Sequence, residues 1–399
     1  MALTATDPVH WDPYNHAQRI SPYDTWRRLR DEAPVYHNEK YRFYALSRFD
    51  DVLSASLDTA TFSSAHGITL DGIPMESPIP MMIMMDPPHH DVLRKVVSRA
   101  YTPKRVAAIE DRIRELCAQY LDPFVGAGSM DYVRDFGMRL PVMVISSLLG
   151  FPEKDHDQLR EWSDTMLHRE EGHEGFTQEQ QDMLVGVTTY YYEIVTMRKE
   201  NPQDDMISAL TQVDFEDLDG TRRNLTDMEI LGMISLISNA GNETVARLLG
   251  WASVTLARNP GARAELAADP SLIPGAVEEL LRYDAPSPIQ GRYTLHDVEM
   301  HGTTIPQHSI VALLTGSAGR DERQFNEPDR FDIRRKNERH LSFGYGAHFC
   351  LGAALARLEG RVGIAETLAR FPEWTVDEDR VEYVATNTVR GPASSPISF

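Results

Sequence analysis

Cysteine is nearly absent: the 399 residues include only Cys117 and Cys350. So few cysteines exclude a disulfide framework and a cysteine-rich zinc site, and they are typical of a reducing compartment. The sequence also has no apolar run near the ~18 residues that a membrane-spanning helix needs. Its first residues lack the basic and apolar regions of a signal peptide. We therefore expect a cytoplasmic protein that does not bind a membrane.

Positive charge is also scarce. Forty lysines and arginines stand against sixty aspartates and glutamates, so the net charge is −20. This acidity disfavours nucleic acid and anionic membranes as partners. The stretch 94–105 departs from it and is either a solvated helix face or a local positive patch. It contains no acidic residue, and its basic residues are Arg94, Lys95, Arg99, Lys104 and Arg105.

No linker rich in proline, glycine or serine divides the chain, and no internal repeat or low-complexity tract occurs. With 42% apolar and 25% charged residues, the composition is that of an ordinary globular protein. We expect one domain over residues 1–399, with a small β-rich part near the N-terminus and a large helical part.

Apolar residues at three- and four-residue spacing predict a mainly helical protein. The clearest helix covers about residues 226–257, where Thr226-Asp-Met-Glu229 has the form of a capping box and Asn259-Pro260 marks the end. A helix of this length spans roughly 46 Å, so it should cross the whole domain. Further helices are predicted near 22–32, 88–100, 105–122, 137–150, 155–170, 178–200 and 352–370.

Strand patterns are short and scattered, which favours small antiparallel sheets at the edge of a helical body. The fold class is therefore mainly α with minor antiparallel β. The strands are expected at 42–46, 288–293, 298–300, 309–314, 382–388 and 396–399.

A glycine-rich loop around Cys350 carries the main chemical signal. Gly344 and Gly346 permit a tight turn before the cysteine, and a helical pattern begins directly after it. The positive end of that helix should lower the pKa of the Cys350 thiol and favour the thiolate that a soft metal needs. Gly352 leaves space for a flat group against the helix. These residues alone leave a metal ligand and a catalytic nucleophile open, whereas Cys117, inside a helical pattern, is expected to be a buried apolar residue.

The segment Phe343-Gly-x-Gly-x-His348-x-Cys350-x-Gly352 resembles the haem-binding loop of the cytochrome P450 family. The resemblance implies the cytochrome P450 fold, with haem b (iron protoporphyrin IX) between the long helix and the loop. It also implies that Cys350 is the axial thiolate ligand of the iron, a donor that favours O–O cleavage. Further haem contacts are implied for Phe343, Gly344, Gly346 and Gly352.

A second match lies inside the long helix, at Ala240-Gly241-Asn242-Glu243-Thr244. A glycine there costs up to ~1 kcal/mol relative to alanine, so either a ligand or a neighbouring helix should approach its backbone. Thr244 can also bond back to a preceding carbonyl. The segment resembles the family's oxygen-binding groove. By that resemblance Gly241, beside Ala240, makes room for dioxygen, Thr244 holds water, and Glu243 supplies protons from solvent.

Two sets of charged residues complete the resemblance. Glu279 and Arg282 lie on one helical face, and with Arg330 they are implied to form an ion triad that serves folding. Haem carries two propionates, which need cationic or hydrogen-bonding partners when partly buried. The resemblance gives that role to His90, Arg94, Arg292 and His348.

The substrate pocket is expected to be apolar. By resemblance a methionine-rich loop at 63–86 lies over the haem, and methionine adapts to irregular apolar shapes. Plain core packing of this loop is the alternative. The pocket residues expected from the loop, the long helix and two later segments are Ile68, Leu70, Met82, Met85, Ile237, Ala240, Ile289, Thr388 and Val389.

The resemblance implies a monooxygenase that oxidises an apolar small molecule such as a terpenoid, branched lipid, steroid or polyketide-like compound. Electrons are expected from NAD(P)H through a reductase and a ferredoxin, and the basic stretch 94–105 suits an acidic ferredoxin. A monomer is expected. The alternatives are a peroxide-driven peroxygenase, a non-catalytic haem-thiolate binding protein and, without haem, a cysteine hydrolase.

Overall fold

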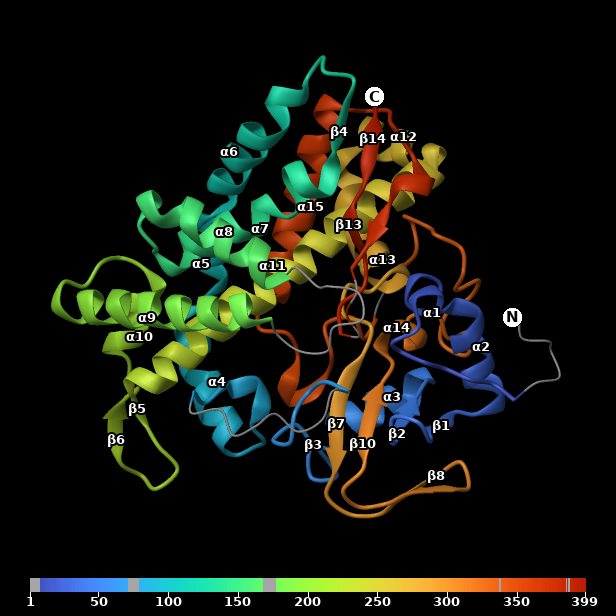
Figure 1. Cartoon of the computed structure of the whole chain (residues 1–399), viewed down its shortest axis with the longest axis horizontal. Helices are drawn as coiled ribbons and strands as arrows, with labels where there is room; N and C mark the ends of the chain where they lie inside the picture. Colours follow the sequence, from blue (N-terminus) through green and yellow to red (C-terminus); the bar gives the residue numbers. More distant parts are fainter. Residues whose placement is uncertain (1–7, 71–78, 168–176, 337–338, 385, 387) are drawn as a thin grey trace.

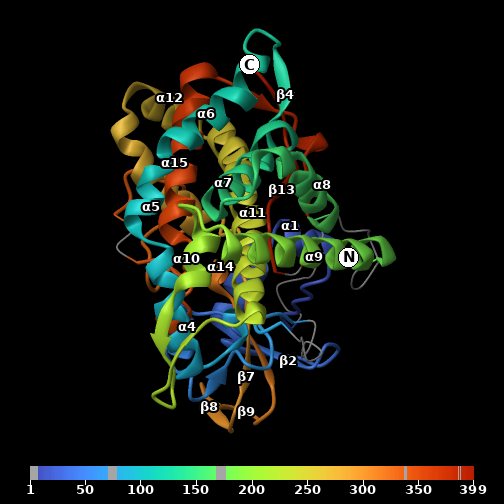
Figure 2. The ribbon, with the colours of Figure 1, turned by 90° about the vertical axis from the view of Figure 1, so that its left-hand side faces the viewer.

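One long helix, α11 (Asp227–Arg258), runs through the middle of the molecule (Figure 1, Figure 2). The computed structural model describes residues 8–70, 79–167, 177–336, 339–384, 386 and 388–399. The Thr226 hydroxyl accepts a hydrogen bond from the Glu229 N–H, and the Glu229 carboxylate accepts one from the Thr226 N–H. The predicted capping box is therefore present. The helix ends before Pro260, which opens the next helix because proline fits a first turn but not an interior.

Helices surround α11 and make up the larger part of the molecule, which confirms the predicted fold class (Figure 2). The predicted helix at 105–122 is divided into α5 and α6, and five helices, α1, α3, α10, α12 and α14, were not predicted. The helices other than α11 are α1 (His16–Ile20), α2 (Tyr23–Glu32), α3 (Phe49–Leu57), α4 (His89–Ala100), α5 (Pro103–Ala108), α6 (Glu110–Leu121), α7 (Arg139–Leu149), α8 (His156–Leu167), α9 (Gln178–Glu200), α10 (Met206–Gln212), α12 (Pro260–Ala268), α13 (Ile273–Tyr283), α14 (Thr315–Ala318) and α15 (Ala353–Arg370).

A sheet of five strands, in the order β1-β2-β10-β7-β3, lies beside the helical body at the lower right of Figure 1. Its pairs are antiparallel except β10 and β2, which run parallel with Ile310 opposite Phe43. These two strands are distant in sequence, so no hairpin fixes their relative direction. The strands are β1 (Val35–Asn38), β2 (Phe43–Leu46), β3 (Phe62–Ser63), β7 (Gln290–Thr294) and β10 (Ile310–Leu313).

Short antiparallel strands form the other sheets of the described ranges. Of the residues that the structure describes at 382–388, where a longer strand was expected, only β12 belongs to a sheet. These strands are β4 (Ser129–Asp131) with β11 (Thr375–Val376) and β14 (Pro396–Ser398), β5 (Asp214–Glu216) with β6 (Arg222–Asn224), β8 (Val298–Met300) with β9 (Thr303–Ile305), and β12 (Glu382–Tyr383) with β13 (Pro392–Ser394).

Buried apolar side chains form a large core among the helices and smaller cores around the sheet. The helical core includes Ile113, Ile234 and Leu249, which are fully buried. Phe43 and Val311 belong to the cores beside the five-stranded sheet. Burial of each such side chain contributes about 1.5–3 kcal/mol to folding. Among the helices of the described ranges, none is both long and apolar enough to cross a bilayer.

The ion group predicted on α13 differs from the structure in one member. Glu279 and Arg282 form a fully buried pair, with Arg282 Nε and Nη2 donating to the carboxylate oxygens at 2.7 and 2.8 Å. The third member is Arg335, whose Nε donates to Glu279 Oε1 at 3.2 Å. Arg330 was predicted in this place, but its side chain is 60% exposed and pairs with Glu327. Only the backbone carbonyl oxygen of Arg330 joins the group, as an acceptor from Arg282.

Candidate active site

A large cavity lies between α11 and the loop that carries Cys350. The loop and the beginning of α15 form one wall, and the middle of α11 forms the opposite wall. Residues of α4, of α7 and of the segment between α13 and β7 close the sides. Most of the lining side chains are apolar, so the cavity suits a large, mainly apolar occupant.

The loop before Cys350 is held in a tight conformation by two glycines. Gly344 and Gly346 have φ angles of 67° and 72°, in the left-handed region that other residues rarely adopt. A Cβ on Gly346 would also lie 2.7 Å from the Ser56 carbonyl oxygen, so the loop lies directly against the end of α3. The Cys350 N–H donates to the Phe343 carbonyl oxygen at 2.8 Å. These constraints turn the chain so that Cys350 faces the cavity.

The protein environment of Cys350 does not by itself produce a thiolate. Burial raises the pKa of the Cys350 thiol, against the opposing effects of the Gly352 N–H, the charges of Arg94 and Arg357, and the Ala353 N–H. The N–H groups at the beginning of the helix do lower this pKa, as expected, but desolvation outweighs them. A metal cation reverses the balance, since a coordinating thiol is deprotonated outright. Cys350 is thus suited to become an anion when it binds a metal.

The side chains predicted to hold two propionates lie together at one edge of the cavity. His90, Arg94 and His348 line it, and the His90 and His348 ring centroids are 4.3 Å apart. Arg94 Nη2 donates to the Phe349 carbonyl oxygen at 2.6 Å, which fixes the guanidinium beside the Cys350 loop. Arg292 lies behind them, 5% exposed, and does not line the cavity itself.

Positive potential accumulates at this edge. Burial and the charges of Arg292 and His90 lower the pKa of His348 to about 3. Burial likewise lowers the pKa of Arg292 to about 10. Nε2 of His348 is buried and has no hydrogen-bond partner within the part of the chain that the structure describes. An anionic group at this edge would relieve the repulsion and supply the missing partner.

The α11 wall of the cavity contains Ala240, Gly241 and Thr244. The Thr244 hydroxyl donates to the Ala240 carbonyl oxygen at 2.9 Å, so it bonds back to its own helix. A Cβ on Gly241 would lie 2.8 Å from the Ile145 side chain of α7, so this glycine admits a neighbouring helix. The sequence allowed a back-bond from Thr244 to its own helix and a neighbouring helix packed against Gly241. Both are present, and both lie at the cavity wall.

Glu243 does not line the cavity. It lies near Arg247, where burial lowers the pKa of the guanidinium and the Glu243 charge raises it. Arg247 donates in turn to the Pro392 carbonyl oxygen. A proton from Glu243 therefore needs an intermediate, such as Thr244 or a water molecule, to reach the cavity.

Comparisons with known proteins agree with this geometry. The sequence profile of the family described as cytochrome P450 matches residues 142–391, which is more than half of the chain. The chain belongs to the cytochrome P450 family. Similar proteins include cytochrome P450 123 of Mycobacterium bovis, which is 40% identical over 100% of this chain and 99% of the relative.

Two further relatives cover nearly the whole of this cytochrome P450. Vitamin D(3) 25-hydroxylase of Pseudonocardia autotrophica is 35% identical over 100% of this chain and 99% of that protein. A solved cytochrome P450 structure from Chondromyces apiculatus has a TM-score of 0.89 at 32% identity and 97% coverage of each chain. Membership implies a monooxygenase with haem, a thiolate ligand and dioxygen. A thiol in the cavity and a cationic edge with an unpartnered ring nitrogen fit that cofactor.

The predicted substrate pocket of this cytochrome P450 divides between the cavity and the core. Met82, Ile237 and Ala240 line the cavity. Leu70 is instead buried in a core beside the five-stranded sheet, and Met85 packs against the helical core. The loop 63–86 thus serves both purposes that the sequence left open, and its residues 71–78 lie outside the described ranges.

Two other predicted pocket residues, Ile68 and Thr388, make backbone hydrogen bonds to neighbouring segments. The Ile68 carbonyl oxygen accepts from the Gly291 N–H at 2.7 Å. The Thr388 carbonyl oxygen accepts from the Ser287 hydroxyl at 3.1 Å. Neither Ile68 nor Thr388 lines the cavity, so their prediction as pocket side chains is wrong.

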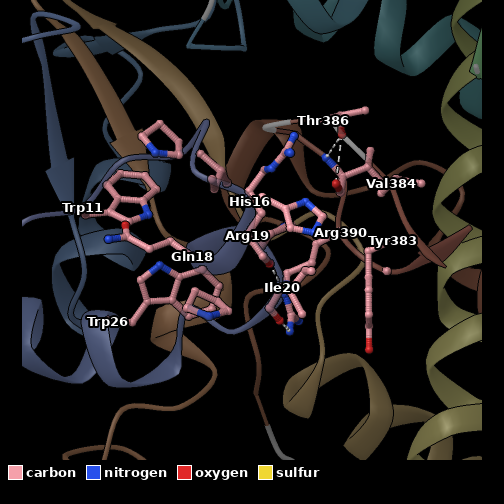
Figure 3. A pocket seen from close by; sticks show the side chains of 16 residues that line it. Trp11, His16, Gln18, Arg19, Ile20, Trp26, Tyr383, Val384, Thr386 and Arg390 are labelled. Atoms are coloured by element: carbon pink, nitrogen blue, oxygen red, sulfur yellow. Dashed lines mark hydrogen bonds between the residues drawn. The ribbon is translucent and has the colours of Figure 1, made fainter. Parts of the chain in front are cut away.

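Ile289 and Val389 line a second, smaller cavity and not the cavity beside Cys350 (Figure 3). Trp11 lies on one side of this second cavity and Arg390 on the other. Residues 286, 287 and 290 face the Cys350 cavity, so this segment forms the wall between the two. The prediction placed Ile289 and Val389 on the wrong side of that wall.

Several lining residues were not predicted. Leu248 continues the spacing of Ile237 along α11, and Glu359 lies two helical turns after Gly352 on α15. Helical periodicity could have found both. Tyr101, which follows α4, also lines the cavity, and no sequence signal indicated it.

Proposed function

We propose that this cytochrome P450 uses Cys350 as the thiolate ligand of the haem iron and inserts one oxygen atom of dioxygen into an apolar small molecule. The observation that carries the proposal is the position of Cys350, which faces a large cavity opposite the wall that α11 forms. Bound haem supplies the activation of dioxygen, and a thiolate ligand favours O–O cleavage.

The protein's own side chains supply binding, orientation and protons. His90, Arg94 and His348 suit the propionates at the cavity edge, supported by the nearby charge of Arg292. Thr244 lies on the opposite wall, where its hydroxyl can exchange the Ala240 carbonyl for a water molecule. We assign proton delivery from solvent to Glu243, through Thr244.

The substrate is proposed to be mainly apolar, with at most a few polar groups. Met82, Ile83, Leu236 and Ile237 give the cavity apolar walls, and Gln290 offers a polar contact. Relatives carry the names vitamin D(3) 25-hydroxylase and cyclomarin C epoxidase. These names and the wall chemistry favour a terpenoid, steroid or polyketide-like substrate.

Spectroscopy of the purified protein tests the proposal. The reduced protein should bind carbon monoxide with the strongly red-shifted Soret band of thiolate-bound haem. A panel of apolar compounds should shift the ferric spectrum where one displaces the water ligand, and those compounds should stimulate consumption of reduced cofactor. A colourless protein, or one whose carbon monoxide complex lacks the red shift, would contradict the assignment.

Thr244→Ala should retain haem binding but divert reducing equivalents to peroxide. The change removes the hydroxyl that we assign to water and proton transfer, so product formation should fall by about 10²-fold. The measurement is the ratio of product and peroxide to cofactor consumed. Thr196→Ala is a matched control, because that hydroxyl makes the same bond to a carbonyl four residues earlier, at an exposed position of α9. Tight coupling in Thr244→Ala would argue against the relay.

The electron donor is proposed to be an acidic ferredoxin that docks on the basic stretch 94–105, with NAD(P)H and a reductase upstream. Lys95, Arg99 and Lys104 are exposed on α4 and α5. Helix α4 also carries Arg94, which donates to the Phe349 carbonyl oxygen of the Cys350 loop. On a protein with a net charge of −20, such a patch provides local complementarity to an acidic partner.

Charge reversal of Lys95, Arg99 and Lys104 to glutamate should slow haem reduction by ferredoxin at least about 10-fold at low ionic strength. The difference should shrink as salt screens the charges. Stopped-flow reduction over a salt series measures it. A control carries the same total charge change at Lys40, Lys154 and Arg380, exposed residues outside the stretch. Equal reduction rates in both variants would exclude this docking face.

A further inference from the structure

Besides Nε2 of His348, two polar groups at the cavity have no hydrogen-bond partner within the described residues. They are the hydroxyl of Tyr101 and Oε2 of Glu359. Both side chains line the cavity, and they are only 8% and 1% exposed. Native proteins rarely leave buried polar groups unsatisfied and commonly supply a bound water molecule.

These groups come from two elements that meet near the sulfur of Cys350. Tyr101 follows the last turn of α4, and Glu359 lies on α15 two turns after Gly352. A Cβ on Gly352 would lie 3.8 Å from the Tyr101 hydroxyl oxygen and 3.9 Å from Cys350 Sγ. The hydroxyl and the sulfur therefore flank the same small space, which the glycine keeps open.

Burial disfavours the charged form of both groups. Burial raises the pKa of Glu359 well above its ordinary value. Burial raises the pKa of Tyr101 too, and Glu359 and Cys350 would raise it further in their charged forms, so the three groups lie within electrostatic range of one another. A neutral carboxyl group and a hydroxyl can each donate one hydrogen bond and accept others. Together they offer the two or more polar partners that a buried water molecule needs.

We infer that Tyr101 and Glu359 jointly hold an ordered water molecule on the Cys350 side of the cavity and that this polar pair tunes the sulfur ligand. The inference rests on the proposed role of Cys350. Backbone N–H groups of Gly352 and Ala353 already act on the sulfur. Additional hydrogen-bond donors near a ligating sulfur withdraw electron density from the metal and raise its reduction potential. Tyr101 and Glu359 are therefore positioning residues, which act on the reaction only through Cys350.

The test measures the midpoint potential of the ferric/ferrous couple in haem-loaded protein. Tyr101→Phe and Glu359→Leu should each lower the ferrous-to-ferric ratio at a fixed potential several-fold, where a tenfold change corresponds to about 59 mV. Glu359→Gln should stay close to the parent, because an amide also donates and accepts. The double variant Tyr101→Phe/Glu359→Leu should shift no further than either single variant, since both remove the same water.

Tyr36→Phe is the matched control. Its hydroxyl accepts from the Trp11 N–H in the core beside the sheet, so its loss should lower thermal stability and leave the potential unchanged. Unchanged potentials in folded Tyr101→Phe and Glu359→Leu overturn the inference, as do fully additive shifts in the double variant. A parent protein without thiolate-bound haem defeats the proposed function instead, and its carbon monoxide spectrum distinguishes that case.

Discussion

Replacement of Cys350 with serine should abolish both the red-shifted carbon monoxide complex and substrate oxidation. A serine hydroxyl is a poor and far less polarisable ligand, so the electron donation that favours O–O cleavage is lost. Loss of a group that only hydrogen-bonds a metal ligand lowers metal affinity or activity by about 10–100-fold. Loss of the ligand itself should therefore reduce activity by more than about 100-fold. The carbon monoxide spectrum and the rate of product formation provide the two measurements.

Cys117→Ala is the control for that experiment. Cys117 is fully buried in α6 within the helical core, and burial raises the pKa of its thiol to about 12, so it is an apolar residue at neutral pH. The variant should lose some stability while retaining the spectrum. If Cys350→Ser keeps the red-shifted complex and Cys117→Ala loses it, the ligand has been assigned to the wrong cysteine.

Local sequence signals predicted the helices well, because each signal acts within one turn. The capping box at Thr226 and the proline after Asn259 set the bounds of α11 almost to the residue. Strand pairing was predicted less well. The parallel pair of β2 and β10 joins distant segments, and its direction depends on the packing of the chain between them.

The site could be predicted where a short motif fixes both the backbone and the side chain. The loop ending at Cys350 is such a case, and so is His90 beside His348. Side-chain direction in irregular segments could not be predicted. Ile289 follows residues that face the Cys350 cavity, yet its own side chain lies on the other side of the wall. Tyr101 reaches the cavity only because α4 ends beside α15, which is a tertiary fact.

The ion group on α13 shows the same limit and provides the largest expected effect on stability. Spacing correctly joined Glu279 to Arg282, but Arg330 and Arg335 lie in one irregular segment, and only packing decides which one turns inward. Arg335 does so: it is 13% exposed, contacts Glu279, and donates to the carbonyl oxygens of Asn326, Glu327 and Arg330.

Glu279→Ala should therefore lower the free energy of unfolding by about 3–5 kcal/mol, because it leaves the fully buried Arg282 without its carboxylate. Arg335→Ala should also destabilise the protein, since it removes the partly buried bond to Glu279 and three exposed bonds to carbonyl oxygens, at up to about 1 kcal/mol each. Arg330→Ala should change stability by no more than about 1 kcal/mol, as expected for an exposed pair. Urea unfolding of the three variants, followed by circular dichroism, ranks them. A loss in Arg330→Ala as large as that in Arg335→Ala would mean that the inward arginine is Arg330, as the family resemblance implied.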